Sequence, residues 1–183
     1  AESDICCTSS NAVKIIESLP PGDILFVPDA NLGNYIAKKT GWELTLWPGH
    51  CNTHHRLRKE DIDRARAAHP EAQLIVHPEC REEVWQEADF VGSTAALIAY
   101  AKKSPHREFI VGTEYGILHQ LHKECPDKTF YLASQGLVCP NMKATSLRKV
   151  RDALANLSPR ITVEESIRLK AKQAFDRMLE LSN

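Results

Sequence analysis

Short apolar runs alternate with stretches of helical periodicity along this sequence, and this alternation restricts its fold. Most of the apolar runs are continuous, which is typical of strands buried on both faces of a sheet. Strand–helix alternation with short connections predicts an α/β fold of pseudo-symmetric, repeated three-layer αβα domains with short parallel sheets. The expected strands span residues 23–27, 43–47, 73–77, 108–112 and 129–132. The expected helices span residues 10–18, 32–39, 59–68, 81–87, 94–103 and 115–123.

Two segments of the chain match each other without gaps at a constant offset. The matched pairs, all 85 positions apart, are Pro20 with Pro105, Leu25 with Ile110, Asp29 with Glu114 and Leu32 with Ile117. Each copy continues through a helix and a strand to a loop that holds a cysteine, Cys51 in the first copy and Cys139 in the second. A repeat of this length indicates duplicated domains rather than a solenoid.

The repeat divides the chain into three expected parts. Residues 1–57 form one αβα domain, residues 58–139 a second, and residues 140–183 a C-terminal helical tail. The second domain includes a helix–strand–helix half, residues 56–87, that has no counterpart in the first. Because half a sheet leaves an exposed strand edge, we expect the chain to begin inside a domain. In the tail, Thr162 and Glu165 have capping-box spacing for a last helix.

Charge and composition exclude several classes of protein. The formal net charge is −1 with mixed signs, so the basic stripe of a nucleic-acid-binding protein is absent. The longest apolar stretch, residues 95–101, is too short to cross a membrane. The N-terminus does not resemble a signal peptide, and the six cysteines are too sparse for a secreted disulfide framework. We therefore expect a cytoplasmic protein with no nucleic-acid or membrane partner.

Cys51 and Cys139 occupy equivalent loops of the two copies. Pseudo-symmetry brings equivalent loops to a common axis, where two thiolates would bind a soft metal or an iron–sulfur cluster. For each cysteine alone, a buried free thiol is the alternative. Zinc is a further alternative for Cys51, because His50, His54 and His55 lie beside it.

His77 and Glu79 follow an expected buried strand. They therefore lie at its carboxyl end, where open α/β sheets place ligands. A histidine beside a carboxylate suits general acid–base catalysis. A simple ion pair in a loop is the alternative interpretation.

Hydroxyl groups precede an expected helix at the same place in both copies. They belong to Ser9 in the first copy and to Ser93 and Thr94 in the second. Hydroxyls and free N–H groups at a helix start favour an anion such as phosphate or carboxylate. Ordinary N-capping is the alternative, and it is far more common.

These residues together resemble the quinolinate synthase family, the iron–sulfur enzymes of de novo NAD synthesis. The resemblance extends over nearly the whole chain in order. It is carried by the stretches CCTSSNAV at 6–13, PDANLGNYIAKKTGW at 28–42, GHC at 49–51, HPEC at 77–80, DFVGST at 89–94, FIVGTEYGILHQL at 109–121 and CPNMK at 139–143.

The resemblance implies three pseudo-symmetric domains around one 4Fe–4S cluster, with one cysteine ligand from each domain. Cys51 and Cys139 resemble the ligands of the second and third domains. The first-domain ligand has no counterpart here, so the chain resembles the second and third domains with the tail. The resemblance also places His77 and Glu79 in the cavity, with Glu79 in proton transfer. It assigns carboxylate or phosphate binding to the residues Ser9, Ser93 and Thr94.

The resemblance further implies an enzyme that condenses iminoaspartate with dihydroxyacetone phosphate to quinolinate. One open iron would act as a Lewis acid. An L-aspartate oxidase or dehydrogenase that supplies iminoaspartate is an implied partner. Because the first domain is missing, we expect this chain to be inactive alone. The alternative is a non-catalytic fragment that binds an anionic metabolite or a metal, such as zinc at Cys51 and its neighbouring histidines.

Overall fold

The computed structural model describes residues 1–182 and divides them into two compact units. The central unit is Pro20–Cys139. The terminal unit joins Ala1–Leu19 to the described part of the tail that begins at Pro140. The division into residues 1–57, 58–139 and 140–183 stays a prediction about the organisation of the chain.

Two parallel sheets form the framework of the central unit. The smaller sheet pairs β1 (Leu25–Phe26) with β2 (Thr45–Leu46). The larger sheet has the strand order β4-β3-β5-β6, and every neighbouring pair is parallel. Its strands are β3 (Gln73–Val76), β4 (Phe90–Val91), β5 (Glu108–Gly112) and β6 (Thr129–Leu132). The predicted α/β class with short parallel sheets is confirmed.

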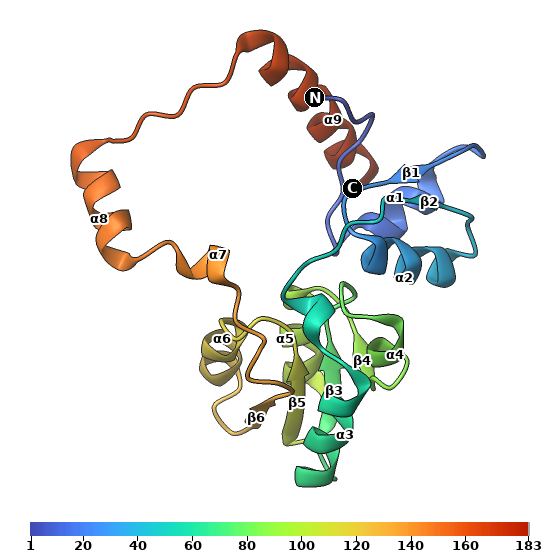
Figure 1. Ribbon diagram of the computed structural model, residues 1–183, viewed down its shortest axis with the longest axis vertical. Coiled ribbons are helices and arrows are strands. Elements are labelled where there is room, and N and C mark those ends of the chain that lie inside the picture. Colours follow the sequence, from blue (N-terminus) through green and yellow to red (C-terminus); the bar gives the residue numbers. More distant parts are fainter. Residues whose placement is uncertain (183) are drawn as a thin grey trace. The chain divides into compact units, whose positions relative to one another are not determined.

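Helices cover both faces of the larger sheet, which makes three layers (Figure 1). Along β3, Leu74 and Val76 face one layer and Ile75 faces the other, as the alternation of side chains on a strand requires. One layer holds α3 (Lys59–Ala68) and α4 (Glu82–Trp85), and the other holds α5 (Thr94–Lys103) and α6 (Ile117–Glu124). All three of these strand residues are fully buried, so continuous apolar runs are what such a strand needs.

The predicted elements agree with the structure apart from their ends and one strand. The helices over 59–68 and 94–103 and the strands over 108–112 and 129–132 have the predicted bounds. The strands at 23–27 and 43–47 shorten to two residues each. Strand β4 was not predicted, because Phe90 and Val91 alone are too short a run to produce a period. The remaining helix of this unit, α2 (Ala30–Thr40), starts earlier than expected because Asp29 caps it.

In the terminal unit, α1 (Ala12–Ser18) packs against α9 (Glu165–Ser182). The backbone N–H of Cys6 donates to the carbonyl of Ala174, which joins the chain segment before α1 to α9. Ala174 and Met178 are buried, whereas Ile167 of the same helix is 46% exposed. The shorter helices α7 (Pro140–Lys143) and α8 (Leu147–Asn156) precede α9 along the chain.

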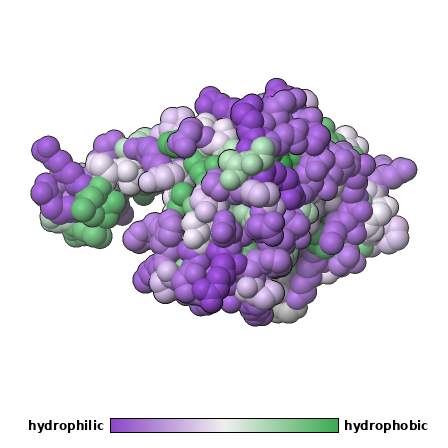
Figure 2. All heavy atoms as spheres, turned by 90° about the horizontal axis from the view of Figure 1, so that it is seen from below, coloured by the Kyte–Doolittle hydropathy of each residue, from purple (hydrophilic) through white to green (hydrophobic). Residues whose placement is uncertain are grey.

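The surface in Figure 2 is mainly hydrophilic, with separate hydrophobic patches. Several apolar side chains of α8 and the segment after it are more than 70% exposed, namely Leu147, Leu154, Leu157 and Ile161. Within residues 1–182, no helix combines the length and the apolar character needed to span a membrane.

A tight contact between β3 and β5 gives a test of this fold. A Cβ atom added at Gly112 would lie 2.6 Å from the Val76 side chain, so that side chain or the strand that carries it must shift. We expect Gly112→Ala to lower the free energy of unfolding by about 1–3 kcal/mol, measured by chemical denaturation. Gly22→Ala is the control, because its Cβ would meet nothing within 4 Å, and it should stay within about 0.5 kcal/mol of the parent. Equal effects of the two changes would contradict the packing.

Candidate functional site

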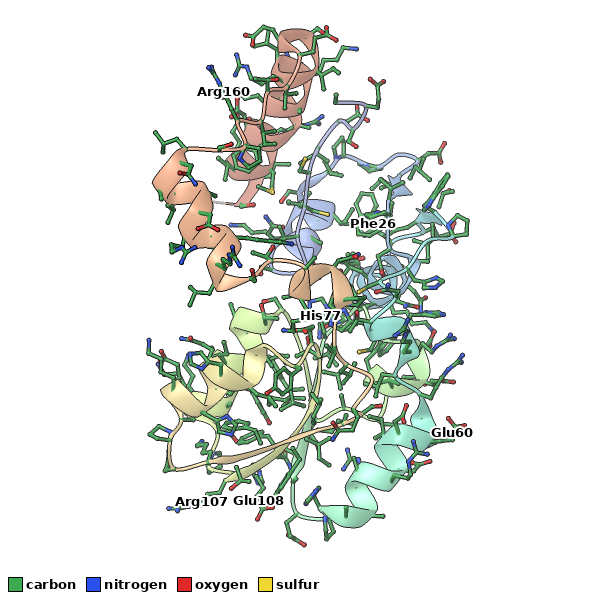
Figure 3. All side chains as sticks on the ribbon, turned by 60° about the vertical axis from the view of Figure 1, so that its left-hand side comes forward. Phe26, Glu60, His77, Arg107, Glu108 and Arg160 are labelled. Carbon is green, nitrogen blue, oxygen red and sulfur yellow. The ribbon has the colours of Figure 1, made fainter. Side chains whose placement is uncertain are left out.

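The carboxyl ends of three adjacent parallel strands supply the candidate site. His77 and Glu79 follow β3, Thr113 and Glu114 follow β5, and the loop to Cys139 follows β6. Figure 3 shows His77 at the end of this sheet opposite to Arg107 and Glu108. Because the strands are parallel, these segments emerge at one edge, as the sequence predicts for His77 and Glu79.

His54 is the residue at which this edge and the Cys51 loop meet. It lies in the short 3₁₀ helix His54–Arg56, three residues after Cys51. Its Nδ1 is 2.8 Å from Oε2 of Glu79, and its Nε2 is 2.9 Å from Oγ1 of Thr113. Its ring also stacks on that of His77, with the centroids 4.5 Å apart. These contacts fix the His54 ring in position and orientation.

The charge states of His54, Glu79 and His77 depend on one another. Burial opposes the charging of His54, but hydrogen bonds to Cys51 and Glu79 prevail and raise its pKa to about 9. The hydrogen bond from His54 in turn lowers the pKa of Glu79. Burial, together with the charge of His54, lowers the pKa of His77 to about 4. Near neutral pH, therefore, a His54 cation donates to a Glu79 carboxylate beside a neutral His77.

Cys51, His54 and Glu79 together can hold a metal ion if the His54 cation releases a ring proton as the ion binds. Their Sγ, ring nitrogen and carboxylate oxygen atoms all lie within 4.8 Å of one another. Cys51 is half-buried and in no disulfide, so its sulfur is available as a ligand. A thiolate, an imidazole and a carboxylate form a donor set that suits zinc or iron.

Cys139 is connected to the same strand end through Glu114. Its backbone N–H donates to Oε1 of Glu114 at 3.2 Å, and Glu114 directly follows Thr113, the partner of His54. Cys139 is also half-buried and outside any disulfide. The two predicted ligand cysteines thus both lie in loops held at the carboxyl end of β5. Two cysteines outside any disulfide in such loops fit an iron–sulfur group by the chemistry of their donors.

Of the three histidines near Cys51, only His54 belongs to the metal-capable group. His50 stacks on His55 with ring centroids 3.7 Å apart. His55 contacts the Asn31 amide and the Arg81 guanidinium. Burial, followed by the Arg81 charge, lowers the pKa of His55 to about 4.

The hydroxyl residues have different surroundings. Ser93 is buried and is the N-cap of α5, where its Oγ accepts the N–H of Ala96 at 3.3 Å. Thr94 is the first residue of that helix and is exposed. Ser9 lies in the terminal unit, ahead of α1, so its place in a common site stays a prediction.

Cys80 is the fully buried cysteine beside the site. Its thiol donates to the carbonyl of Gly112 at 3.3 Å. Burial raises its pKa far above that of an ordinary thiol. It is therefore part of the core.

Sequence reasoning missed Thr113, and it considered His54 only as a zinc ligand. Nothing in the sequence singles out a threonine after a strand, since its role comes from the approach of His54. The repeat does pair Asp29 with Glu114, and both are buried acids, although it assigns them no role.

Thr113 gives a direct test of the His54 geometry. We expect Thr113→Val to lower the free energy of unfolding by about 1–3 kcal/mol, because it leaves Nε2 of the buried His54 without a partner. Thr129→Val is the control, since Thr129 is exposed on β6 and should tolerate the change. Chemical denaturation would measure both, and a Thr113 variant as stable as its control would refute the contact.

Comparison with known proteins identifies the family of this chain. The family model described as quinolinate synthetase A protein matches residues 1–180. The chain is 57% identical over 182 residues to a quinolinate synthase of Desulforudis audaxviator, covering 99% of this chain and 60% of the relative. It is 52% identical to a quinolinate synthase of Geotalea uraniireducens over 99% of this chain and 60% of the relative. It is 49% identical to quinolinate synthase 1 of Methanosarcina acetivorans over 98% of this chain and 59% of the relative.

The chain therefore spans about 60% of the length of these curated relatives. The match nevertheless extends over almost all of the sequence, including the Cys51 loop, the strand ends and the tail. This chain belongs to the quinolinate synthetase A family.

Proposed function

We propose that this chain is a portion of a quinolinate synthase. The complete enzyme condenses iminoaspartate with dihydroxyacetone phosphate, with loss of phosphate and water. The observation that carries the proposal is that the loops of Cys51 and Cys139 are both held at the carboxyl end of β5, the first through His54 and Thr113 and the second through Glu114. Membership of the family supports it, since the relatives that cover this chain carry the name of that activity.

In this proposal Cys51 and Cys139 hold a 4Fe–4S cluster, and the third ligand comes from a domain outside this chain. When bound, the cluster supplies one open iron as a Lewis acid for substrate oxygen or nitrogen. The two cysteines suit this role because both are half-buried and neither is in a disulfide. Their loops also approach the same strand end, through His54 at Thr113 and through Glu114.

Glu79 is the proposed proton-transfer residue. Its carboxylate accepts a hydrogen bond from Nδ1 of His54 at 2.8 Å and lies 3.8 Å from Nδ1 of His77. His54 holds a proton beside Glu79, and both of its ring nitrogens have fixed partners. The Glu79 carboxylate is therefore kept ionised and oriented, which is the form that can accept a proton from substrate. His77, buried and stacked on His54, is the second residue proposed to act in catalysis and to contact substrate.

Ser93, Thr94 and Ser9 are the proposed contacts for substrate carboxylate or phosphate. Ser93 and Thr94 begin α5, where free backbone N–H groups favour an anion. The Ser93 hydroxyl accepts a capping bond, and its own proton is still free to be donated. The enzyme that supplies iminoaspartate, an L-aspartate oxidase or dehydrogenase, is the proposed partner.

Zinc binding is the second candidate function. The specific observation in its favour is the mixed donor set of Cys51, His54 and Glu79, which suits a zinc ion without any contribution from Cys139. The two proposals therefore differ in whether Cys139 is needed.

Serine variants of the two cysteines decide between them. We expect Cys51→Ser and Cys139→Ser each to abolish cluster retention in the full-length protein, because serine is a poor ligand for a cluster iron. An iron and acid-labile sulfide count on anaerobically prepared protein measures this. Cys125→Ser is the matched control, because Cys125 is buried in the core beneath α6. A normal cluster in Cys51→Ser or Cys139→Ser would show that the substituted cysteine is not a ligand. Zinc that is retained in Cys139→Ser but lost in Cys51→Ser would favour the second function.

Glu79 is tested by removing its charge at constant shape. We expect Glu79→Gln to retain the cluster but to lower turnover by at least about 100-fold, as removal of a general base does. Quinolinate formation by the full-length enzyme is the measurement. The control is Glu83→Gln, an exposed residue of α4. Full activity of the Glu79 variant would remove this residue from the mechanism.

A further inference from the structure

A buried carboxylate fastens the Cys51 loop. Asp29 lies between β1 and α2 and is only 5% exposed. Its Oδ2 accepts the backbone N–H of Cys51 at 2.6 Å, and its Oδ1 accepts that of Leu32 at 2.7 Å. The carboxylate thus spans two segments and brings the cysteine loop to the start of the helix.

A second buried carboxylate does the same for the Cys139 loop. Glu114 lies between β5 and α6 and is 7% exposed. Its Oε1 accepts the N–H of Cys139 at 3.2 Å, and its Oε2 accepts that of Gly116 at 2.6 Å. As with Asp29, one oxygen accepts the cysteine N–H, and the other accepts an N–H at the start of the following helix.

The backbone beside the two carboxylates repeats as well. The N–H of Ala30, directly after Asp29, donates to the carbonyl of Gly49 at 2.8 Å. The N–H of Tyr115, directly after Glu114, donates to the carbonyl of Leu137 at 2.8 Å. Gly49 and Leu137 each lie two residues before the cysteine. Since Asp29 and Glu114 are also matched in the repeat, the contact belongs to the duplicated unit and not to one loop.

Helix capping accounts for only part of this arrangement. Asp29 is the N-cap of α2, and its bond to Leu32 is the capping bond. The N-cap of α6 is Gly116, so Glu114 is not a cap residue. What the two acids share is the bond to the cysteine N–H. Burying a carboxylate costs more desolvation free energy than burying a neutral amide, which could also accept these N–H groups. The presence of charged acids at both positions therefore needs a further explanation.

The chemistry of iron-bound sulfur supplies that reason. The reduction potential of an iron–sulfur cluster depends on net charge and on hydrogen bonds to its sulfur atoms. A peptide N–H that donates to a carboxylate does not donate a hydrogen bond to a sulfur atom of the cluster. A fixed negative charge nearby also opposes the arrival of an electron. Both effects lower the potential and keep the cluster oxidised.

We infer that Asp29 and Glu114 are matched positioning residues. They hold the Cys51 and Cys139 loops for the cluster, and they keep its reduction potential low. This inference rests on the proposed function, in which the two cysteines are cluster ligands. A low potential serves a cluster that binds substrate as a Lewis acid and transfers no electron.

The first measurement concerns the protein before it receives a cluster. Cysteine-selective ¹⁵N labelling of the full-length protein gives few amide signals, which the Cys51→Ser and Cys139→Ser variants assign. We expect Asp29→Asn to accelerate exchange of the Cys51 N–H by about tenfold or more, and Glu114→Gln to do so for Cys139, because each loses a charge-assisted hydrogen bond. Asparagine remains a good N-cap, so α2 should persist in the first variant.

The second measurement is the midpoint potential of the reconstituted protein, followed by the spectroscopic signal of the reduced cluster. We expect each variant to shift the potential to a more positive value. Loop positioning alone would not produce this shift. The controls are Asp23→Asn and Glu71→Gln, exposed acids of the same unit, which should change neither the exchange rates nor the potential.

Two results would overturn the inference. If the Cys51 N–H exchanges at an unchanged rate in Asp29→Asn, or the Cys139 N–H in Glu114→Gln, the carboxylate does not hold that loop. If the midpoint potential is unchanged, the carboxylates have no electrostatic effect on the cluster. If Cys51→Ser and Cys139→Ser keep a normal cluster, the proposed function fails instead. The exchange measurement on cluster-free protein still tests the carboxylate contacts in that case.

Discussion

The parallel pairing of β3 with β5 is the interaction on which the rest of the site depends. Its register places Val76 opposite Gly112, so the next residues, His77 and Thr113, leave the sheet side by side. The N–H of His77 continues the ladder by donating to the carbonyl of Gly112. A shift of one residue would turn every side chain of β3 to the opposite face and would separate Glu79 from Thr113. The two buried layers forbid such a shift, because they divide Leu74 and Val76 from Ile75.

Carboxylates dominate the polar groups at this edge, and their donors are short and rigid. Asp29 and Glu114 accept backbone N–H groups, and Glu79 accepts the ring N–H of His54. None of these contacts relies on a long flexible lysine or arginine side chain, which would lose conformational entropy on being fixed. Rigid donors preserve the geometry of a site more accurately than surface ion pairs, whose free energies are small. The framework of the site is therefore built before any ligand arrives.

Sequence reasoning succeeds here where a local pattern carries the information. The buried runs of β3, β5 and β6 identify the sheet, and the position of His77 and Glu79 after β3 identifies the edge. The contacts of His54 lie beyond such reasoning, because Glu79 and Thr113 are 25 and 59 residues away from it. Asp29 and Glu114 are intermediate, since the repeat pairs them but only the turn geometry reveals what they accept. Strand β4 could not be predicted from the sequence, because two residues are too few to show a hydrophobic period.

The burial of Cys80 has a consequence for the reaction of this unit with metal ions and oxidants. Its thiol is sealed in the core and stays protonated, while Cys51 and Cys139 in the same unit remain partly accessible. A protonated, inaccessible thiol neither captures metal in transit nor exchanges with a disulfide at a useful rate. The fold thus sorts chemically identical groups by accessibility. If the proposed function holds, an incoming cluster reaches the sulfur atoms of Cys51 and Cys139 in this unit and is kept from that of Cys80.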